Sequence, residues 1–477
     1  MSKISRRQFL GGAGAMAFSA SMLGGLVPSR AVAQEADDYK ALVCVFFYGG
    51  LDHNDTLLPT DQASYDMFAA RRSELMNAYN SNSAESSRNI NNLLTLNPTR
   101  PLNLGERSFG LPPQMRPLHE MFDNNELAVL GSVGPLLQPV TRQQFEDQSV
   151  SVPSRLFSHN DQQSTWMALN TEGSTVGWGG RLLDATLRSN DALDPTFMGI
   201  TTDRSNTFLS GQTAKGFSVS PNGPVRINAA EQRWRLGGSS NYDDAREQLL
   251  AYLRRDNFTS DNVFERDTAR LQAAGVTNGI TFANAYNSVG TFATTFPDTR
   301  LGGQLKMVSE TISLNQQLNT KRQVFFVGIG GFDSHSSQTN TVPSLQAQIA
   351  NGIKAFRDAM VEQNMWDKVT LFTASDFGRT LNDNGDGTDH GWGGHHFIAG
   401  GSVDGGNMYG HFPSFDVTGG DYTDNRGRLI PRVSVEQYAS TLGSWFGLSS
   451  EQINEEFPNL NNFAVKDLGF MRATSNS

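Results

Sequence analysis

The sequence predicts an α/β fold with a mostly parallel central sheet and helices on both of its faces. Three observations predict it: continuous apolar runs, amphipathic helical segments between them, and acidic residues soon after the runs. Continuous apolar runs are typical of strands that are buried on both sides. Alternation of such strands with helices favours parallel pairing through crossover connections.

Four apolar runs are the expected strands, and they share a high content of Val, Leu and Phe: residues 41–48, 126–130, 324–327 and 369–373. A further run at 397–400 is also expected to be extended. Two segments have apolar residues on one helical stripe, at 301–312 and 345–360. They flank the third run, as a strand–helix alternation requires.

Residues 1–33 are expected to be a twin-arginine signal peptide rather than part of the fold. They contain SRRQFL, a weakly apolar stretch and an AVA cleavage site. The stretch is too rich in Gly, Ser and Ala for a transmembrane anchor, and no later segment is apolar enough. We therefore expect the twin-arginine translocation machinery as a partner, and a periplasmic or extracellular location. Residues 34–477 would form a single domain, with a partly helical insertion at about 189–297.

Composition argues against several classes of function. The net charge is −10, and removal of the four basic residues within 1–33 changes it to −14. Such an acidic chain is a poor ligand for nucleic acid. The single cysteine, Cys44, excludes an intramolecular disulfide. There is no Gly-x-Gly-x-x-Gly fingerprint, haem motif or cysteine cluster to indicate a redox cofactor.

Acidic and histidine residues near the ends of the runs suggest a divalent-metal site. Ligands collect at the carboxyl ends of parallel strands, and Asp52, Asp333 and Asp376 each follow a run. Asp333 and His335 alternate in an extended segment, so both could reach one ion. His390 lies in a Gly-rich segment. The alternative is that the carboxylates only close turns. A mixed set of ligands leaves zinc, calcium and magnesium open.

Asp389, His395 and His396 are candidate pocket residues beside these ligands. The two adjacent histidines open the run at 397–400. Because side chains alternate along a strand, we expect one of them to point into the site and the other away from it.

Three residues are candidate catalytic groups: Ser158, His159 and Arg379. Ser158 could be a nucleophile at a helix amino end, or it could cap that helix together with Asp161. His159 could be a further metal ligand or a general acid. Arg379 could clamp a phosphate or sulfate group, or form an ion pair with Asp376 of little energetic value.

Together these motifs resemble a bacterial, twin-arginine-exported family, catalogued as domain of unknown function 1501 in the alkaline phosphatase/sulfatase-like superfamily. The segments that carry the resemblance include FYGGLDHN at 47–54, FSHNDQ at 157–162, GFDSH at 331–335, DFGRT at 376–380 and DHGW at 389–392. The resemblance implies an alkaline phosphatase-like domain with one or two divalent ions at the carboxyl edge of the sheet. Asp52, Asp333, His335, Asp376 and His390 would hold them, and Ser158 is the nearest match to the nucleophile.

Two functions follow as hypotheses. The first is an exported metal-dependent hydrolase of phosphate or sulfate esters that acts on a small anionic ester. The second is a non-catalytic periplasmic or surface binding protein that retains a degenerate hydrolase fold. The second is favoured by the short spacing between Asp333 and His335, and by Phe377 where the two-metal phosphatases have histidine.

Overall fold

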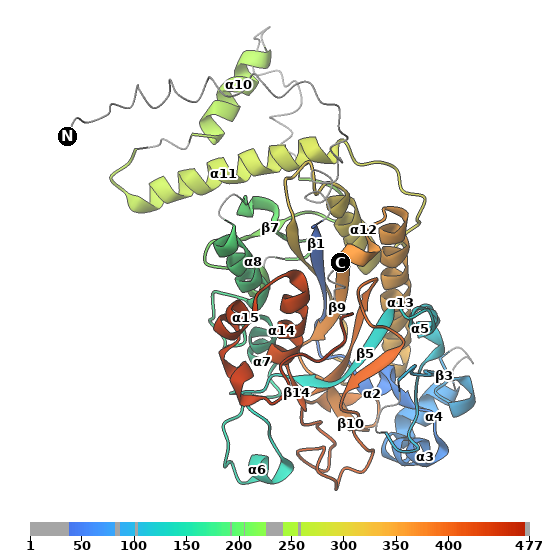
Figure 1. The fold of residues 1–477 in the computed structure, drawn as a ribbon. Helices are drawn as coiled ribbons and strands as arrows, with labels where there is room; N and C mark the ends of the chain where they lie inside the picture. Colours follow the sequence, from blue (N-terminus) through green and yellow to red (C-terminus); the bar gives the residue numbers. More distant parts are fainter. Residues whose placement is uncertain are drawn as a thin grey trace, which may run out of the picture. The chain divides into compact units, whose positions relative to one another are not determined.

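A nine-stranded sheet forms the centre of the protein (Figure 1). The computed structural model describes residues 38–81, 86–100, 104–190, 193–204, 206–225, 242–255 and 259–472. The expected signal peptide at 1–33 lies outside the described residues. The sheet order is β13-β5-β12-β9-β1-β8-β6-β7, and β14 pairs with β5. Its strands are β1 Lys40–Phe47, β5 Leu127–Gly134, β6 Gly199–Thr201, β7 Gly216–Ser218, β8 Arg322–Ile329, β9 Val369–Ser375, β12 Gly394–Gly400, β13 Asn407–Gly410 and β14 Val433–Ser434.

All strands of this sheet run in one direction except β12. This strand is antiparallel to both of its neighbours, β5 and β9, whereas every other pair is parallel. The predicted α/β class and the mostly parallel sheet are therefore confirmed. All five apolar runs are strands, as β1, β5, β8, β9 and β12.

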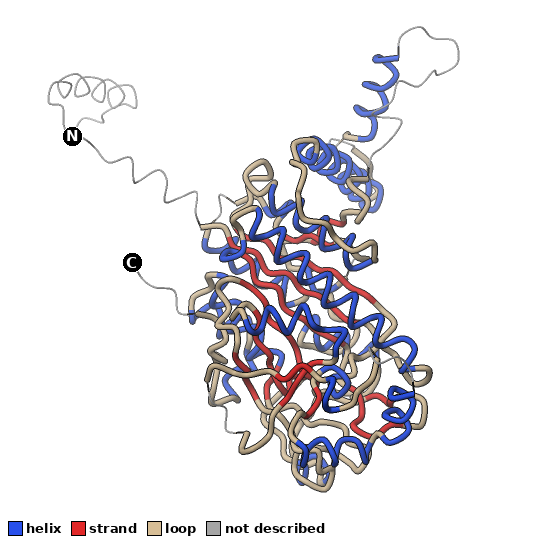
Figure 2. Tube along the Cα trace, turned by 90° about the vertical axis from the view of Figure 1, so that its right-hand side faces the viewer, coloured by secondary structure: helices blue, strands red, loops and turns tan. Residues whose placement is uncertain are grey.

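Helices cover both faces of the sheet because β1 is apolar on both sides. Leu42, Cys44 and Phe46 belong to a core cluster that includes residues of α8 (Trp178–Ser189) and α14 (Val435–Phe446). The residues between them on β1 face the other way by strand alternation, toward α12 (Arg300–Ser313) and α13 (Gln338–Glu362). Figure 2 shows long helices lying across the strands on that side. Each fully buried side chain contributes about 1.5–3 kcal/mol.

Both predicted amphipathic helices are present, in α12 and α13. The range 189–297, expected to be an insertion, contributes β6 and β7 to the main sheet as well as two helices, α10 (Tyr242–Leu253) and α11 (Val263–Tyr286). Within the described ranges, no helix has the length and apolarity to cross a bilayer. The remaining helices with α labels are α2 His53–Thr56, α3 Gln62–Arg71, α4 Ser73–Ser81, α5 Arg116–Asp123, α6 Arg142–Glu146, α7 His159–Ala168 and α15 Ser450–Glu456.

Two small sheets complete the described strands. One has the order β2-β4-β3, from Leu58–Pro59, Phe109–Leu111 and Leu94–Thr95. The other pairs β10 (Arg379–Asp383) with β11 (Thr388–His390) in antiparallel fashion. This second pair follows β9 directly, so it lies at the carboxyl edge of the main sheet.

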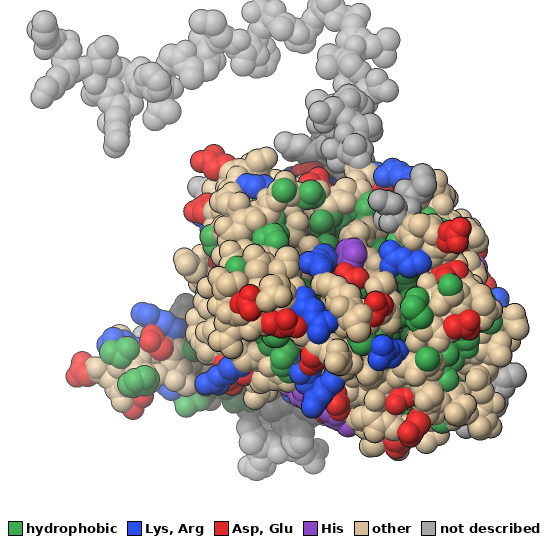
Figure 3. Space-filling view, turned by 90° about the horizontal axis from the view of Figure 1, so that it is seen from below, with side chains coloured by type: hydrophobic (Ala, Val, Ile, Leu, Met, Phe, Trp, Pro, Cys, Tyr) green, Lys and Arg blue, Asp and Glu red, His purple; other side chains and the backbone are tan. Residues whose placement is uncertain are grey.

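The register of three parallel strands brings distant residues to that edge. Phe47 of β1 pairs with Ile329 of β8 and with Ser375 of β9. The segments that follow these strands therefore start side by side. Figure 3 views the protein from below, where histidine, basic and acidic side chains lie close together on the surface.

Candidate metal centre

His159, Asp333 and His390 form a compact group at the carboxyl edge of the sheet. Each offers one potential ligand atom, and these atoms all lie within 4.8 Å of one another. His159 is the first residue of α7, Asp333 follows β8, and His390 ends β11. The structure therefore assembles a possible metal-binding triad from three segments that are far apart in the sequence.

His335 adjoins this triad. Its Nε2 lies 2.8 Å from Nε2 of His390 and 3.1 Å from Oδ1 of Asp333. Asp333 is also 3.3 Å from His390 Nε2 and 3.4 Å from His159 Nε2. Four ligands at about 2.0–2.1 Å from a zinc ion would lie about 3.3 Å from one another. The contacts of Asp333 with His159 and His390 have this spacing. The 2.8 Å contact between His335 and His390 is shorter, and His335 is not in the group of three.

In each imidazole the other ring nitrogen contacts an oxygen. His159 Nδ1 donates to Asp376 Oδ2 at 2.6 Å, and His390 Nδ1 donates to the Phe157 carbonyl at 2.8 Å. His335 Nδ1 lies 3.3 Å from Oδ1 of Asp389. A carbonyl only accepts, so a neutral His390 keeps its lone pair on Nε2. Metal-ligating histidines are typically oriented in this way by a carboxylate or carbonyl.

The electrostatics of the cluster also fit a cation. If His335 and His390 are both neutral and both donate through Nδ1, each has a lone pair on Nε2. These lone pairs face each other at the 2.8 Å contact between the two Nε2 atoms and repel. A cation, an added proton or the Nε2–H tautomer of His335, which donates to His390 Nε2, removes that repulsion. His159 Nε2 is buried without a hydrogen-bond partner among the described residues. The donor set therefore fits a divalent ion.

Charges within the cluster shift its pKa values. The hydrogen bond to Asp376 raises the pKa of His159, whereas burial lowers the pKa of His390. Burial alone would raise the pKa of Asp333, but the charges of Arg379, His159 and His335 outweigh it and lower that pKa. Asp333 is therefore ionised at neutral pH, as a metal ligand must be.

Asp376 supports the triad and does not belong to it. Its Oδ2 accepts hydrogen bonds from the Gly49 amide at 3.1 Å, from Gln163 at 2.9 Å and from His159. It is fully buried. The sequence predicts Asp376 as a metal ligand. In the structure its carboxylate orients the imidazole of His159 instead.

Arg379 is not placed as an anion clamp. Its side chain is fully buried, and its donors go to the carbonyls of Gly49, Phe332 and Thr388 and to Asp333. All three nitrogens of this guanidinium are bonded within the protein and none of its surface is exposed, so it is not placed to grip a substrate group. The expected role is therefore corrected: Arg379 fixes Asp333.

Asp52, another expected ligand, is also outside the cluster. Arg72 binds its two carboxylate oxygens at 2.6 and 2.9 Å, and Gln338 donates to Oδ2 at 2.6 Å. The amides of Asn54 and Asp55 donate to Oδ1. All of this network is buried, so Asp52 serves as a structural anchor at the end of β1.

The adjacent histidines of β12 are both buried, and neither belongs to the triad. His395 Nδ1 accepts from the Ser132 amide and its ring lies 4.8 Å from that of His53. The ring of His396 lies 4.9 Å from that of Trp166. The expectation that one of them points into the site is wrong for this cluster, because β12 carries both into the packed interior.

Ser158 occupies the N-cap position of α7, but its side chain makes no capping bond. Its hydroxyl donates to Asp161 Oδ2 at 2.7 Å. Asp389 lies at the rim, where it contacts His335 and accepts a hydrogen bond from Asn384.

Two supporting groups escaped the sequence analysis, Gln163 and the Phe157 carbonyl. Gln163 is four residues after His159 on α7, so helical spacing could have placed it on the same face. A backbone carbonyl leaves no signal in the sequence. Phe157 has φ +74°, an unusual conformation for a bulky residue that only coordinates reveal.

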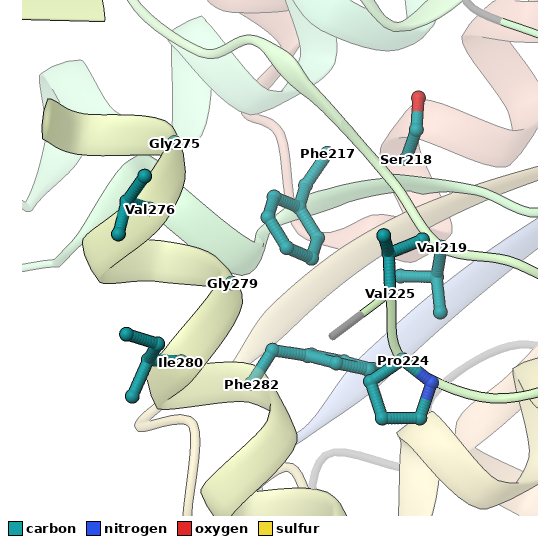
Figure 4. A pocket seen from close by; sticks show the side chains of 10 residues that line it. All are labelled: Phe217, Ser218, Val219, Pro224, Val225, Gly275, Val276, Gly279, Ile280 and Phe282. Atoms are coloured by element: carbon teal, nitrogen blue, oxygen red, sulfur yellow. The ribbon is translucent and has the colours of Figure 1, made fainter. Parts of the chain in front are cut away.

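The apolar cavity in Figure 4 is a separate feature. It has a volume of about 250 Å³ and lies between β7 and α11, with Phe217, Val219, Ile280 and Phe282 among its lining residues. None of its lining residues is titratable, so it offers no group for acid–base or metal chemistry.

A family model described as "Protein of unknown function (DUF1501)" matches residues 39–457. The chain belongs to the DUF1501 family. The match includes all residues of the metal cluster, and it confirms the family that the sequence motifs predicted. No curated protein matches this DUF1501 chain.

Among solved structures, the chain is similar to Ps i-CgsB in complex with k-i-k-neocarrahexaose. The identity is 11%, the TM-score is 0.33, and the match covers 89% of this chain and 77% of the other. A second structure of Ps i-CgsB gives 10% identity and the same TM-score. A TM-score this low says nothing about the site.

Proposed function

We propose that this protein is a metal-dependent hydrolase of phosphate or sulfate esters with an alkaline phosphatase-like core. The observation that carries the proposal is the convergence of imidazole Nε2 atoms on Asp333, with the other ring nitrogens of His159 and His390 held by oxygens. Three protein ligands and an open position are typical of catalytic rather than structural zinc sites.

His159, Asp333 and His390 would hold the ion with the fourth position open, and His335 lies beside this set. Zinc suits this set best, because imidazoles outnumber carboxylates. A bound divalent ion would polarise the ester oxygen and lower the pKa of the attacking group. The chain's own contribution is orientation: Asp376 fixes His159, Arg379 fixes Asp333, and the Phe157 carbonyl fixes His390.

The nucleophile in this proposal is either Ser158 or water. Ser158 is adjacent to His159, and its hydroxyl already donates to Asp161, a carboxylate that could accept the proton. Replacement Ser158→Ala separates these choices, because a water nucleophile leaves most of the activity in place.

The test compares ligand variants with a histidine variant outside the cluster. Asp333→Asn and His390→Gln are matched with His119→Gln, whose imidazole contacts the Thr95 carbonyl. Zinc content would be measured by mass spectrometry, and hydrolysis would be followed with 4-nitrophenyl phosphate and 4-nitrophenyl sulfate. We expect both cluster variants to lose bound zinc and to lose activity by about 100-fold or more, and the control to keep both. Unchanged zinc content and unchanged hydrolysis in the cluster variants would refute the proposal.

A non-catalytic binding protein is the second candidate. The specific observation in its favour is that the Arg379 guanidinium is fully buried and bonded within the protein, so it does not face a transferred group. Stoichiometric zinc with no hydrolysis of either ester would favour this candidate.

We also propose export by the twin-arginine machinery to the periplasm or beyond. The supporting features are the SRRQFL and AVA motifs within residues 1–33. Sequencing of the mature amino terminus from an extracytoplasmic fraction tests this, and a full-length chain found only in the cytoplasm would contradict it.

A further inference from the structure

Two adjoining cavities lie beside the metal cluster, and they share Tyr48 and Arg204 as lining residues. The first has a volume of about 410 Å³ and is also lined by Asn160 and Gln163. Gln163 donates to Asp376, which in turn orients His159, so this cavity begins next to the cluster. The second has a volume of about 510 Å³ and extends to Arg300. We refer to both cavities together as the trough.

Two exposed arginines, Arg204 and Arg300, line the trough together with two carboxylates, Asp203 and Glu172. The Arg204 guanidinium lies 4.6 Å from the centre of the Tyr48 ring. Arg300 donates to Asp203 Oδ1 at 2.7 Å, and the Tyr48 hydroxyl donates to Oδ2 of the same carboxylate at 3.2 Å. Glu172 lies 3.9 Å from Arg155, which is outside the trough, whereas Arg204 forms no ion pair with a carboxylate of the described residues. An exposed arginine without a carboxylate partner can pair with an anionic group.

The second cavity also contains buried polar atoms that need a partner. Thr202 and Gln304 line it, and both side chains are buried. Thr202 Oγ1 and Gln304 Oε1 have no hydrogen-bond partner in the described part of the chain. An unsatisfied buried polar atom costs about 1–3 kcal/mol, which a bound ligand or water recovers.

We propose that the trough binds a second anionic group of the substrate, remote from the ester group at the metal cluster. Arg204 and Arg300 would pair with that group, and Gln304 and Thr202 would hydrogen-bond the adjoining part of the molecule. The inference rests on the proposed hydrolase function and narrows its substrate class to esters that carry a further phosphate, sulfate or carboxylate. A simple monoester would leave Arg204 without an anionic partner.

The test uses ligands that cannot be hydrolysed. Linear alkane bisphosphonates with short, medium and long spacers would be compared with the monophosphonates of equal chain length. Alkane disulfonates and carboxyalkyl phosphonates serve as parallel arms that identify the preferred second anion. Affinity for the zinc-loaded full chain would be measured by titration calorimetry. The variants are Arg204→Gln, Arg300→Gln and the double variant. The matched control is Arg270→Gln, whose side chain on α11 is 66% exposed, the same as that of Arg300.

We expect at least one doubly anionic ligand to bind about tenfold more tightly than its singly charged counterpart. The double variant should lose this gain, and Arg270→Gln should keep it. Equal affinities within every pair, or a gain that survives in the double variant, would overturn the proposal. An arginine-dependent gain in a chain that hydrolyses no ester would support the anion site and refute the hydrolase.

Discussion

The role of Asp52 can be decided by a single substitution, Asp52→Asn. The sequence motifs suggest a metal ligand, whereas the structure shows a buried partner of Arg72. The guanidinium of Arg72 gives two hydrogen bonds to Asp52 and others to the carbonyls of Thr380 and Leu381, and its side chain is 2% exposed. Loss of the negative charge leaves this cation buried without a counter-ion.

The expected magnitude follows from that burial. Removal of one partner of a buried ion pair costs about 3–5 kcal/mol. At about 2.1 cal/mol/K per residue, a folded unit of about 440 residues has an unfolding entropy near 0.9 kcal/mol/K, so Tm should fall by about 3–5 °C. The double variant Asp52→Asn/Arg72→Met should recover part of this loss, because it removes the uncompensated charge together with the carboxylate.

The assay pairs thermal unfolding with zinc stoichiometry of the folded fraction. We expect Asp52→Asn to lower Tm while the zinc content stays unchanged, because no atom of Asp52 belongs to the triad. A variant that keeps its Tm but loses zinc would show that Asp52 is a ligand and that the structural role argued for it is wrong.

Three further outcomes are expected. Burial lowers the pKa of His396 to about 3, so this imidazole stays neutral in the folded state but gains a proton in the unfolded state below pH 6.5. The free energy of unfolding therefore falls as the pH drops below 6.5, by about 2 kcal/mol at a pH of about 5. In urea unfolding, His396→Gln should show a correspondingly smaller pH dependence of this free energy. Asp376→Asn should weaken zinc affinity by about 10–100-fold in competition with a chelator, since it releases His159, and unchanged affinity would contradict this role. Gly49→Ala should lower both Tm and zinc affinity. Gly49 has φ +113°, and an added Cβ would lie 2.4 Å from the Asp333 amide nitrogen. A variant with the wild-type Tm and zinc affinity would show that this close approach is not needed.

The main features of the fold could be predicted from the sequence because burial on two faces leaves a local pattern. The runs that became β1 and β8 are apolar throughout, and the run that became β9 is interrupted only by threonines, so their place in the middle of a sheet follows directly. The antiparallel direction of β12 could not be predicted, since strand direction depends on the path of the chain between strands. Strands β6 and β7 have three residues each, which is too short for a periodic signal.

The candidate site was predictable in part. His159, Asp333, His335 and His390 were all identified as metal ligands or candidates for that role, and the structure brings them together. Asp52 was given the wrong role because a local motif does not show which cation is nearest: its partner Arg72 lies on the chain just after α3.

The two supports of the triad meet at one residue, Gly49, just after the end of β1. The Gly49 amide donates to Asp376, which orients His159, and the Gly49 carbonyl accepts from Arg379, which fixes Asp333. Both ligands are therefore set by the position of a single glycine. Because β1 lies in register between β8 and β9, that position is fixed by the pairing of the buried strands. The geometry of the candidate metal centre thus depends on the paired strands in the interior of the sheet, which hold its residues in place.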